Sequence, residues 1–431
     1  MAPIISPVLT TKDIPDESHV VIIGGGIIGL VAALNLAERG VPVVVLEKGR
    51  IAAEQSSRNL GWIRKLNRSA HDMPLALAAE RIWADLSQRT GMDVGYRTPG
   101  LMFAARSEIE LDKYRGWLQS VEGLSLGAKL VTQDDINEIV PGGTITWAGG
   151  IHMPTDGYAE PTLASTAIAT AALRAGALIV ENCAARTLNL NSQNEVLSVV
   201  TERGLIHCNQ VLLSGGIWSR RFLKNLNISL PTLPMVGSVI RTAPMEGPSD
   251  IAFGASNFSF RKCLDGGYIL MQRGALDAPM TPDHIALGMK YIPALKANAE
   301  FVRPNIGRYF FEELFRGFAR SGKKVSPFER ERIQNPQVNR DLVKEALNAA
   351  TEAWPAFADV KVCSTWAGVI DITPDSDPII SKVDDVPGLT LATGFSGHGF
   401  GTSPAAGQLA ADLIMGTNPI VDNASYRFDR F

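Results

Sequence analysis

Glycines and one carboxylate near the start of the chain have the spacing to hold a cofactor that contains a pyrophosphate. Gly24, Gly26 and Gly29 follow an apolar run that begins at His19. In this spacing the first glycine permits a tight turn, the second lets a pyrophosphate approach the backbone, and the third allows close packing of helix on strand. Glu47 ends the next apolar run, where a carboxylate can accept hydrogen bonds from the hydroxyls of a ribose. These residues predict a dinucleotide-binding unit of strand, helix and strand.

The loop after the second predicted strand indicates which dinucleotide binds. It runs from Gln55 to Arg64 and places small hydroxyl side chains beside cations. Such a loop can wrap the pyrophosphate and ribityl chain of FAD, although an ordinary polar surface loop would have the same composition. The cofactor contacts that we expect from this part of the chain are Lys48, Ser56, Ser57, Arg58, Asn59 and Gly61.

A second glycine-rich turn near the C-terminus could bind the ring end of a flavin. It follows an apolar strand at 389–393 and precedes a helix predicted from about Thr402 to Met415. The free N–H groups of such a turn and the positive end of the helix would attract a pyrimidine carbonyl and raise the electron affinity of the flavin. A second phosphate turn, or a helix start without a ligand, would have the same sequence. The residues assigned to this turn are Gly394, Gly397, His398, Gly399 and Phe400.

A third apolar strand, at 211–214, also ends in glycines. It could be an ordinary strand and turn, but a dinucleotide lies at the carboxyl edge of a doubly wound sheet. The further residues assigned to the cofactor site are Ala185, Gly215, Trp218 and Gly368. His398 could also act directly in catalysis, although a lone histidine is more often structural.

The segments between these motifs predict two interleaved domains. Strand-like runs such as LMFAA at 101–105 and GGYILMQ at 266–272 suit a mixed sheet. The expected fold class is α/β, or mixed α+β, with a Rossmann-like FAD-binding domain interleaved with a mixed-sheet substrate domain. The FAD-binding domain is assigned residues 19–92, 142–232 and 360–431. The substrate-binding domain is assigned residues 93–141 and 233–359, with an insertion at about 281–336.

The composition is that of an ordinary globular protein, with 45% hydrophobic and 20% charged residues. A formal net charge of -3 argues against a general nucleic-acid binder, which needs a clear excess of cations. No CxxC pair occurs, so no metal site is expected from the cysteines, which are Cys183, Cys208, Cys263 and Cys363. The first eighteen residues lack the pattern of a signal peptide, and no apolar stretch is long enough to cross a membrane. We therefore expect a cytoplasmic protein.

An aromatic-rich segment at 308–324 lies within the expected insertion. Phe311, Leu314, Phe315 and Phe318 share one helical face by their spacing, and cations lie beside or after it. An amphipathic helix of this kind can lie at a membrane interface, but most such helices bury the apolar face in their own protein. We favour packing against the substrate domain over contact with a membrane.

Taken together, these segments resemble the D-amino-acid oxidase superfamily of flavoproteins, which includes glycine oxidase and sarcosine oxidase. The resemblance runs nearly end to end. Its motifs are GGGIIG at 24–29, LEKG at 46–49, SSRNLG at 56–61, DVGYRTPGLMF at 93–103, DGYAEP at 156–161, GGIWS at 215–219, WAGVIDITPDSDPII at 366–380 and GFSGHGF at 394–400. The resemblance implies an FAD-dependent oxidoreductase.

Two subgroups of the superfamily resemble different parts of the chain. The segments SSRNLG, TPD and GFSGHGF are similar to the sarcosine-oxidase beta subunit, whose relatives act on N-methyl or secondary amino acids. The bacterial membrane-associated L-amino-acid deaminases resemble EKGRIAAEQS at 47–56, GGIWSRRF at 215–222, VSPFERERI at 325–333 and IMGTNPIVD at 414–422, together with the insertion before Pro336. Those deaminases have an N-terminal transmembrane helix, which this sequence does not show, and they lack the GHGF turn.

The resemblance also assigns catalytic candidates, which are Arg273, Arg64 and His398. The deaminase arginine that grips the substrate carboxylate falls on Arg273, and a guanidinium at a strand end can bind a carboxylate bidentately. A solvated strand-end arginine is the alternative. Arg64 resembles a flavin-proximal arginine of sarcosine oxidases. The cysteine that carries covalent flavin in some sarcosine oxidases has no match, since the nearest, Cys363, lies ten residues before Thr373. We expect non-covalent FAD.

The predicted reaction is oxidation of the carbon–nitrogen bond of an amino acid, a small-molecule substrate. Hydride transfer from the α-carbon to flavin N5 would give an imine, which water hydrolyses to a 2-oxo acid and ammonia. Electrons would then pass to oxygen or a quinone. The nearest alternative is oxidative demethylation of an N-methyl or secondary amino acid. A flavin-binding electron-transfer subunit of a larger complex is a second alternative.

Overall fold

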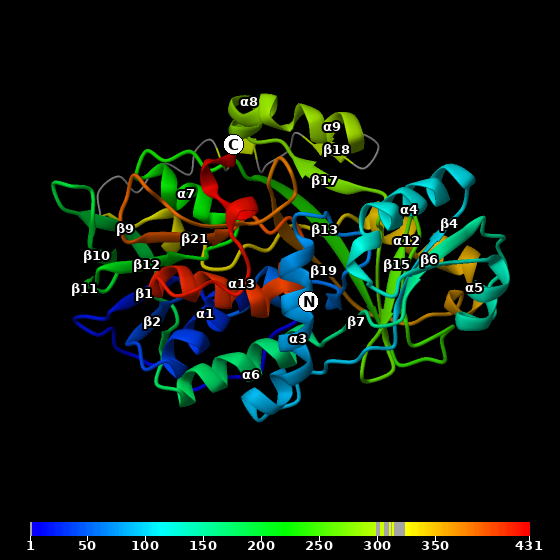
Figure 1. Ribbon diagram of the computed structural model, residues 1–431, viewed down its shortest axis with the longest axis horizontal. Coiled ribbons are helices and arrows are strands. Elements are labelled where there is room, and N and C mark those ends of the chain that lie inside the picture. The colour runs from blue at the N-terminus through cyan, green and yellow to red at the C-terminus, as the bar shows by residue number, and fades with distance from the viewer. Residues whose placement is uncertain (1, 299–301, 306–309, 312, 314–323) are drawn as a thin grey trace.

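The computed structural model describes the whole chain except residues 1, 299–301, 306–309, 312 and 314–323 (Figure 1). Two large sheets lie side by side in it, and helices cover each of them. The helix expected at 308–324 falls mostly outside the described residues. The mixed α/β fold class is confirmed.

The first sheet contains the apolar run that precedes the first glycine motif. Its strands, in spatial order, are β20 (Ile379–Lys382), β21 (Leu389–Thr393), β12 (Gln210–Leu213), β1 (Val20–Ile23), β2 (Val43–Leu46) and β8 (Leu178–Val180). Neighbouring strands are parallel, apart from the antiparallel pair β20 and β21. A parallel sheet is buried on both faces, which explains why β1 and β2 are unbroken apolar runs.

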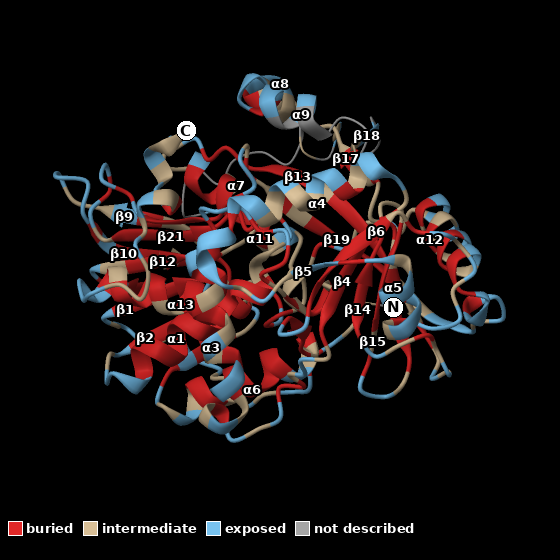
Figure 2. Ribbon diagram, turned by 45° about the vertical axis from the view of Figure 1, so that its right-hand side comes forward, coloured by how far each residue is buried: buried red, intermediate tan, exposed pale blue. Residues whose placement is uncertain are grey.

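Alternate residues of β1 face two different hydrophobic cores. Val20 and Ile22 pack towards helices, whereas Val21 and Ile23 pack towards a small sheet. The helices are α1 (Ile27–Glu38), α3 (Met73–Thr90), α6 (Pro161–Arg174) and α13 (Gly399–Met415). The small sheet consists of β9 (Ala185–Leu190), β10 (Val196–Thr201) and β11 (Leu205–His207). Because α1 is buried along its length, it needs no polar stripe (Figure 2).

The second sheet is mixed and contains the strand-like runs of the middle of the chain. Its strands, in spatial order, are β18 (Val302–Asn305), β17 (Leu276–Pro279), β13 (Leu233–Thr242), β16 (Tyr268–Met271), β15 (Ser259–Lys262), β14 (Ala252–Gly254), β4 (Leu101–Ala105), β6 (Gly149–Met153) and β5 (Lys129–Val131). A long strand, β19 (Val362–Ile372), pairs antiparallel with β13. These two strands run between the two halves of the molecule (Figure 1).

The two faces of the second sheet also carry different cores. On β4, Met102 faces a cluster that includes α12 (Arg340–Ala353), whereas Phe103 faces the side of α4 (Glu108–Ser120). This alternation turns the Phe103 ring towards the short strand β3 (Trp62–Ile63), which follows the hydroxyl-rich loop. The face that carries Phe103 therefore meets the loop that was expected to bind the cofactor.

Short elements connect these layers. They are α2 (Gln55–Arg58), η1 (Glu122–Leu124), α5 (Gln133–Ile139), β7 (Gly157–Tyr158), α7 (Trp218–Lys224), α8 (Pro282–Leu287), η2 (Gly288–Tyr291), α9 (Ile292–Asn298), α11 (Pro327–Arg330), η4 (Pro355–Phe357), η5 (Ala424–Tyr426) and η6 (Phe428–Arg430), where η marks a 3-10 helix. Tyr291 anchors the inserted segment, because its hydroxyl donates to the carbonyl oxygen of Ile372 at 2.6 Å or to that of Pro231 at 2.8 Å.

The strand pairings bear on how the two domains interleave. β6 and β19 belong to segments assigned to the FAD-binding domain, yet both pair with strands of the second sheet. The exact domain boundaries stay a prediction. The four cysteines are free thiols. Within the described residues, no helix is long and apolar enough to span a membrane, and no cluster of His, Cys, Asp and Glu could hold a metal ion.

Close contact between α1 and α13 gives the first testable prediction. A Cβ on Gly407 would lie 2.6 Å from the side chain of Val31 and 2.9 Å from the backbone nitrogen of Ala32. We expect Gly407→Ala to lower the free energy of unfolding by about 1–3 kcal/mol, because the helices must separate. Chemical denaturation measures the change.

The matched control is Gly116→Ala, on the exposed side of α4, where a Cβ would meet nothing within 4 Å. It should raise stability by up to about 1 kcal/mol, because alanine is the better helix former. Equal stability of the two variants would contradict the packing described for α1 and α13.

Candidate functional site

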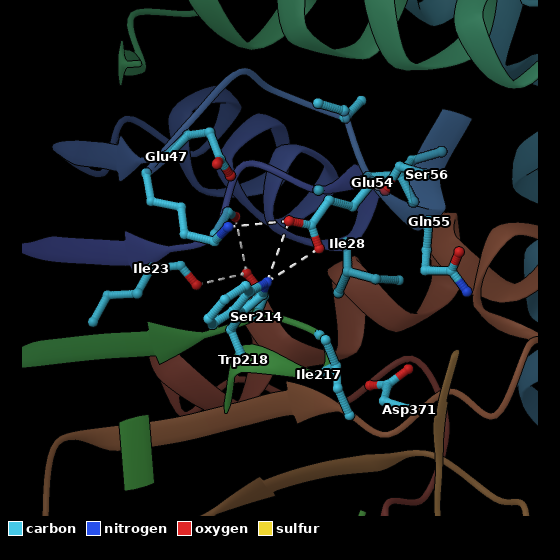
Figure 3. Close-up of a pocket in the computed structure, with 18 of the residues that line it drawn as sticks. Ile23, Ile28, Glu47, Glu54, Gln55, Ser56, Ser214, Ile217, Trp218 and Asp371 are labelled. Carbon is cyan, nitrogen blue, oxygen red and sulfur yellow. Dashed lines mark hydrogen bonds and ion pairs between the residues drawn. The ribbon is translucent and has the colours of Figure 1, made fainter. Parts of the chain in front are cut away.

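A cavity opens where β1, β2 and β12 end at their carboxyl edge (Figure 3). It holds about 1300 Å³ of empty space, including its opening to solvent. Dinucleotides bind at this edge of a doubly wound sheet. The predicted cofactor residues that line the cavity are Gly24, Gly26, Glu47, Lys48, Ser56, Asn59, Ala185, Gly215, Trp218, Gly397, Gly399 and Phe400.

Glycine is required where the turn after β1 meets the end of β12. Gly24 has a φ of 112°, and a Cβ there would lie 2.5 Å from the carbonyl oxygen of Ser214. A Cβ on Gly29 would lie 2.2 Å from the carbonyl oxygen of Gly24. Gly26 is different, because its Cβ would approach only the Ser56 hydroxyl, at 3.2 Å, among the described residues. Gly24 and Gly29 therefore serve packing, and Gly26 leaves space at the cavity.

Two helix N-termini border this cavity. α1 begins after Gly26 and α13 begins after His398. In the described part of the chain neither helix has an N-cap side-chain bond or an acidic residue in its first turn. The Ser56 hydroxyl accepts the N–H of Ile27 at 2.8 Å. Helix ends of this kind attract phosphate and carbonyl oxygens, so the cavity suits a dinucleotide with acceptor groups at both ends.

Glu47 ends β2 where a ribose-binding carboxylate is expected. Its Oε2 accepts the N–H of Gly25 at 2.9 Å, and its Oε1 accepts the N–H of Gly49 at 2.7 Å. Burial raises the pKa of Glu47, while Lys48 and the two backbone donors oppose the rise. Each oxygen can accept a further hydrogen bond, so the carboxylate can still receive the hydroxyls of a ribose.

A strap, residues 326–335, forms part of the cavity wall at the end of the insertion. Lys48 Nζ donates to the carbonyl oxygens of Glu331 at 3.0 Å and Arg332 at 2.8 Å. The same ammonium pairs with Glu54 at 3.0 Å. The charged end of Lys48 therefore ties the strap to β2, and the role assigned to this residue as a direct cofactor contact stays a prediction.

Arg58 binds the same strap. This buried guanidinium donates to the carbonyl oxygen of Gln334 at 2.9 Å and to the side chain of Asn335 at 2.7 Å. It also donates to the carbonyl oxygen of Ala367 in β19, at 3.0 Å. Burial lowers the pKa of Arg58, and Glu54 opposes the change. Arg58 thus joins three chain segments and lies outside the cavity wall.

Other predicted cofactor residues lie beside the cavity. Besides Arg58, these are Gly29, Ser57, Gly61, Gly368, Gly394 and His398. A Cβ on Gly61 would lie 2.2 Å from the carbonyl oxygen of Ala159, and one on Gly368 would lie 2.2 Å from the side chain of Gln55. Ser57 is buried and its hydroxyl faces the carbonyl oxygens of Pro3 and Glu54, both at 3.4 Å. These contacts support the surrounding backbone.

Asp371, near the end of β19, fixes the C-terminal glycine turn. Its Oδ2 accepts the N–H of Gly394 at 2.7 Å and the Thr393 hydroxyl at 3.3 Å. Burial raises the pKa of Asp371 to about 6, while the Gly394 N–H opposes the rise. The side chain lines the cavity (Figure 3). A lone aspartate inside a strand has no spacing signal, so sequence reasoning did not find it.

The predicted catalytic residues come together beside the cavity. The guanidinium carbon of Arg273 lies 3.8 Å from the centroid of the Phe103 ring, and that of Arg64 lies 5.7 Å from it. Nη2 of Arg64 lies 3.3 Å from Nε2 of His398. Burial lowers the pKa of His398 well below its usual value, and the charges of Arg68 and Arg64 add to this. A guanidinium only donates, so neutral His398 accepts at Nε2.

Arg64 and Arg273 have no carboxylate within ion-pair distance in the described part of the chain. Burial lowers the pKa of Arg273, and burial with repulsion from Arg68 and Arg273 lowers the pKa of Arg64 to about 9. The neighbouring cations do have partners, in the pairs Arg68–Asp72 at 2.7 Å and Lys65–Asp156 at 3.4 Å. The two guanidinium groups at Phe103 are therefore the ones that lack a direct ion pair in this cluster.

The sheet edge, the glycine turns and the helix ends form a site of the kind that binds a dinucleotide. The cavity lies beside Arg64 and Arg273, which have no direct ion pair with a carboxylate among the described residues. The profile of the FAD dependent oxidoreductase family, DAO, matches residues 19–413. The chain belongs to this family, and its cofactor is FAD. The expected membership of the D-amino-acid oxidase group is thereby confirmed.

Known proteins of similar sequence or structure come from several branches of this family. An L-amino acid deaminase of Proteus myxofaciens has a TM-score of 0.95 and 30% identity, covering 100% of this chain and 97% of that protein. Glycine oxidase of Pseudomonas aeruginosa is 27% identical over 95% of this chain and 98% of its own length. The mitochondrial sarcosine dehydrogenase of Mus musculus is 23% identical over 98% of this chain, which spans only 42% of that longer protein.

Part of the cavity wall was not found from sequence. The missed residues include Glu54, Ile217, Phe328, Arg332, Ile333 and Asp371. Three of these belong to the strap at the end of the insertion, which is far along the chain from the glycine motif. The similarity of VSPFERERI at 325–333 to the deaminases was the available signal, but it does not reveal which part of the fold this segment meets.

Substitution of Gly26 should weaken FAD binding, whereas substitution of Gly29 should lower stability. Gly26→Ala should fold normally and bind FAD at least tenfold more weakly, because the new methyl group occupies space needed by the pyrophosphate. Gly29→Ala should lower stability by about 1–3 kcal/mol even without FAD, since its Cβ meets backbone. Titration of FAD-free protein with FAD and denaturation without FAD separate the two effects. Equal FAD affinity of wild type and Gly26→Ala would refute this placement.

The strap should retain the cofactor. Lys48→Met removes the ammonium that holds two strap carbonyls, so we expect FAD to dissociate several-fold faster while the fold is kept. Recovery of free-FAD fluorescence after dilution measures the rate. Lys382→Met, at an exposed position of β20, is the matched control. An unchanged rate in Lys48→Met would show that the strap does not limit release.

Proposed function

We propose that this protein oxidises the carbon–nitrogen bond of an amino acid with FAD as oxidant. The observation that carries the proposal is the Arg273 guanidinium, which lies against Phe103 with no carboxylate partner among the described residues. It stands beside Arg64, and Arg64 contacts His398 at the start of α13. A carboxylate bound there would lie next to the glycine turn of the cofactor cavity. The names of the similar proteins support an amino acid substrate.

Arg273 can bind the substrate carboxylate through two parallel N–H donors. One of its nitrogens donates to the carbonyl oxygen of Ala255 at 3.3 Å, and the Tyr114 hydroxyl also contacts the guanidinium. Stacking on Phe103 fixes the plane of the guanidinium. These contacts leave little rotational freedom, so a bound carboxylate would hold the α-carbon in one orientation.

The positive charge of Arg64 and Arg273 also acts on the substrate amine. A neutral amine is the form that can be oxidised, and nearby cations disfavour the ammonium form. His398 adds no charge, because its pKa lies well below neutrality. The arginines would thus help the amine to lose its proton to water, without a dedicated base.

When bound, FAD supplies a two-electron acceptor for this oxidation. Glu47 would hold the ribose, the start of α1 the pyrophosphate, and the glycine turn before α13 the ring. The amino acid loses two electrons and two protons to form an imine, and water converts the imine to a 2-oxo acid and ammonia. Oxygen or a quinone as final acceptor, non-covalent FAD and a cytoplasmic location stay predictions.

The central test is a variant of Arg273. Arg273→Met keeps an apolar side chain against Phe103 but removes the guanidinium group and its paired N–H donors. Substrate affinity should therefore fall more than tenfold, since a charge-assisted hydrogen bond contributes about 1.5–3 kcal/mol. FAD content should stay the same. Anaerobic loss of the flavin absorption band with D-, L- and N-methyl amino acids gives the affinity, and formaldehyde from N-methyl substrates would identify demethylation.

The control is Arg97→Met, which removes an exposed arginine paired with Asp93 at the surface. It should bind substrate as the wild type does. Equal substrate affinity in Arg273→Met and Arg97→Met would exclude Arg273 from substrate binding. A reducible flavin that no amino acid bleaches would contradict the proposed function itself.

A further inference from the structure

Two guanidinium groups lie beside Phe103, and neither forms a direct ion pair with a carboxylate among the described residues. We infer that the substrate carries a second acidic group in addition to its α-carboxylate, and that Arg64 binds this second group while Arg273 binds the first. The inference rests on the proposed function, because it assumes an amino acid at Arg273. It narrows the substrate class to amino acids with two acidic groups.

No carboxylate of the described residues forms a direct ion pair with Arg64, although Asp156 and Asp72 act on it at longer range. The nearby carboxylates are already engaged, because Asp72 binds Arg68 at 2.7 Å and Asp156 accepts the backbone N–H groups of Lys65 and Leu66 at 2.9 Å. The Arg64 guanidinium itself donates to the carbonyl oxygen of Leu66. A guanidinium has several N–H donors, so Arg64 keeps donors that a ligand can use.

Arg273 also has no carboxylate within ion-pair distance among the described residues. Tyr114 is a phenol whose pKa is raised by burial, so it stays neutral. Glu110 acts on Arg273 only at longer range, since its carboxylate accepts the N–H of Arg106 at 2.8 Å. Two like charges that share one aromatic ring repel each other. An anion bound at each guanidinium would relieve this repulsion.

The position of Arg64 favours a substrate contact over a cofactor contact. Neither Arg64 nor Arg273 lines the cofactor cavity, although Gly397, Gly399 and Phe400 of the adjoining turn do. Both guanidinium groups instead lie against Phe103, on the second sheet. Two cations on one ring can bind the two ends of one small molecule.

A further donor at this place also lacks an acceptor. The indole N–H of Trp62 is buried and has no partner within the described residues. Its ring centroid lies 5.8 Å from that of Phe103. A buried unsatisfied donor is costly unless a ligand accepts its hydrogen bond. Oxygen-rich acidic groups are the ligands that would satisfy this donor and both arginines.

The number of guanidinium groups indicates the chemistry of the ligand. An amino acid with one carboxylate offers an anionic group to one guanidinium, whereas an amino acid with two acidic groups offers one to each arginine. The second acid could be on the side chain, as in glutamate, or on the amine, as in an N-carboxymethyl amino acid. In both cases the oxidised bond remains the carbon–nitrogen bond next to a carboxylate.

The first experiment uses the FAD-loaded wild type and pairs of substrates that differ in one acidic group. The pairs are glutamate with glutamine, aspartate with asparagine, and N-(carboxymethyl)alanine with N-methylalanine, each as separate enantiomers. We expect the acidic member of at least one pair to have a kcat/KM about tenfold or more above its neutral partner, since a charge-assisted contact contributes at least that factor. The pair that shows the preference locates the second acid on the side chain or on the amine.

The second experiment assigns the preference to a residue. Arg64→Met should bring the ratio of kcat/KM between acidic and neutral partners close to one, and Arg64→Lys should keep part of it because the charge remains. Arg273→Met should weaken both members of a pair. An acid preference that survives in Arg64→Met would overturn the assignment to Arg64.

Binding without turnover separates this inference from the proposed function. Perturbation of the flavin absorption spectrum measures the affinity of inert ligands, and succinate should bind about tenfold or more tightly than butyrate in wild type but not in Arg64→Met. If no amino acid bleaches the flavin while succinate keeps this advantage, the proposed reaction fails and the diacid site stands. If glutamate, aspartate and N-(carboxymethyl)alanine show no advantage over their partners, and succinate none over butyrate, the inference is wrong.

Discussion

The backbone of the turn after β1 meets the backbone at the end of β12 with no side chain between them. A Cβ at Gly24 would overlap Ser214, and one at Gly29 would overlap Gly24 itself. This contact brings the N-terminus of α1 to the carboxyl edge of the sheet, where Gly26 borders the cavity. The cavity and the helix end beside it both depend on the absence of side chains at Gly24 and Gly29. The other side chains of the cavity wall pack around the backbone positions that these glycines allow.

The cavity is completed by segments that are remote in sequence. Lys48 and Arg58 hold the strap at 326–335 through its carbonyl oxygens, and Asp371 holds the glycine turn before α13 through the N–H of Gly394. A charged side chain that binds several backbone groups can fix a loop without regular structure. Cations beside the cavity can therefore stabilise its walls, even where the surrounding sequence suggests that they bind phosphate.

Local rules were enough to predict the parts of the site that depend on local geometry. The glycine motif, Glu47 and the turn at 394–400 each combine a strand, a turn and a helix start within a few residues, so spacing alone places them. Asp371 and the strap could not be placed in this way, because their positions follow from the pairing of β13 with β19 and from the course of the insertion. Arg64 and Arg273 were predicted from the resemblance to known families. Their shared contact with Phe103 could not be predicted, because it follows from the packing of β4 against β3.

The contacts around Phe103 explain how the protein can hold two guanidinium groups without a direct ion pair before a ligand arrives. The π face of the ring attracts both guanidinium groups, carbonyl oxygens of Leu66 and Ala255 accept from them, and His398 stays neutral. A protonated His398 would add a third positive charge within 3.3 Å of Arg64. Burial is the main cause of the low pKa of His398, and the charges of Arg68 and Arg64 lower it further. The positive field of the arginines would favour anionic ligands and the neutral amine of the proposed reaction.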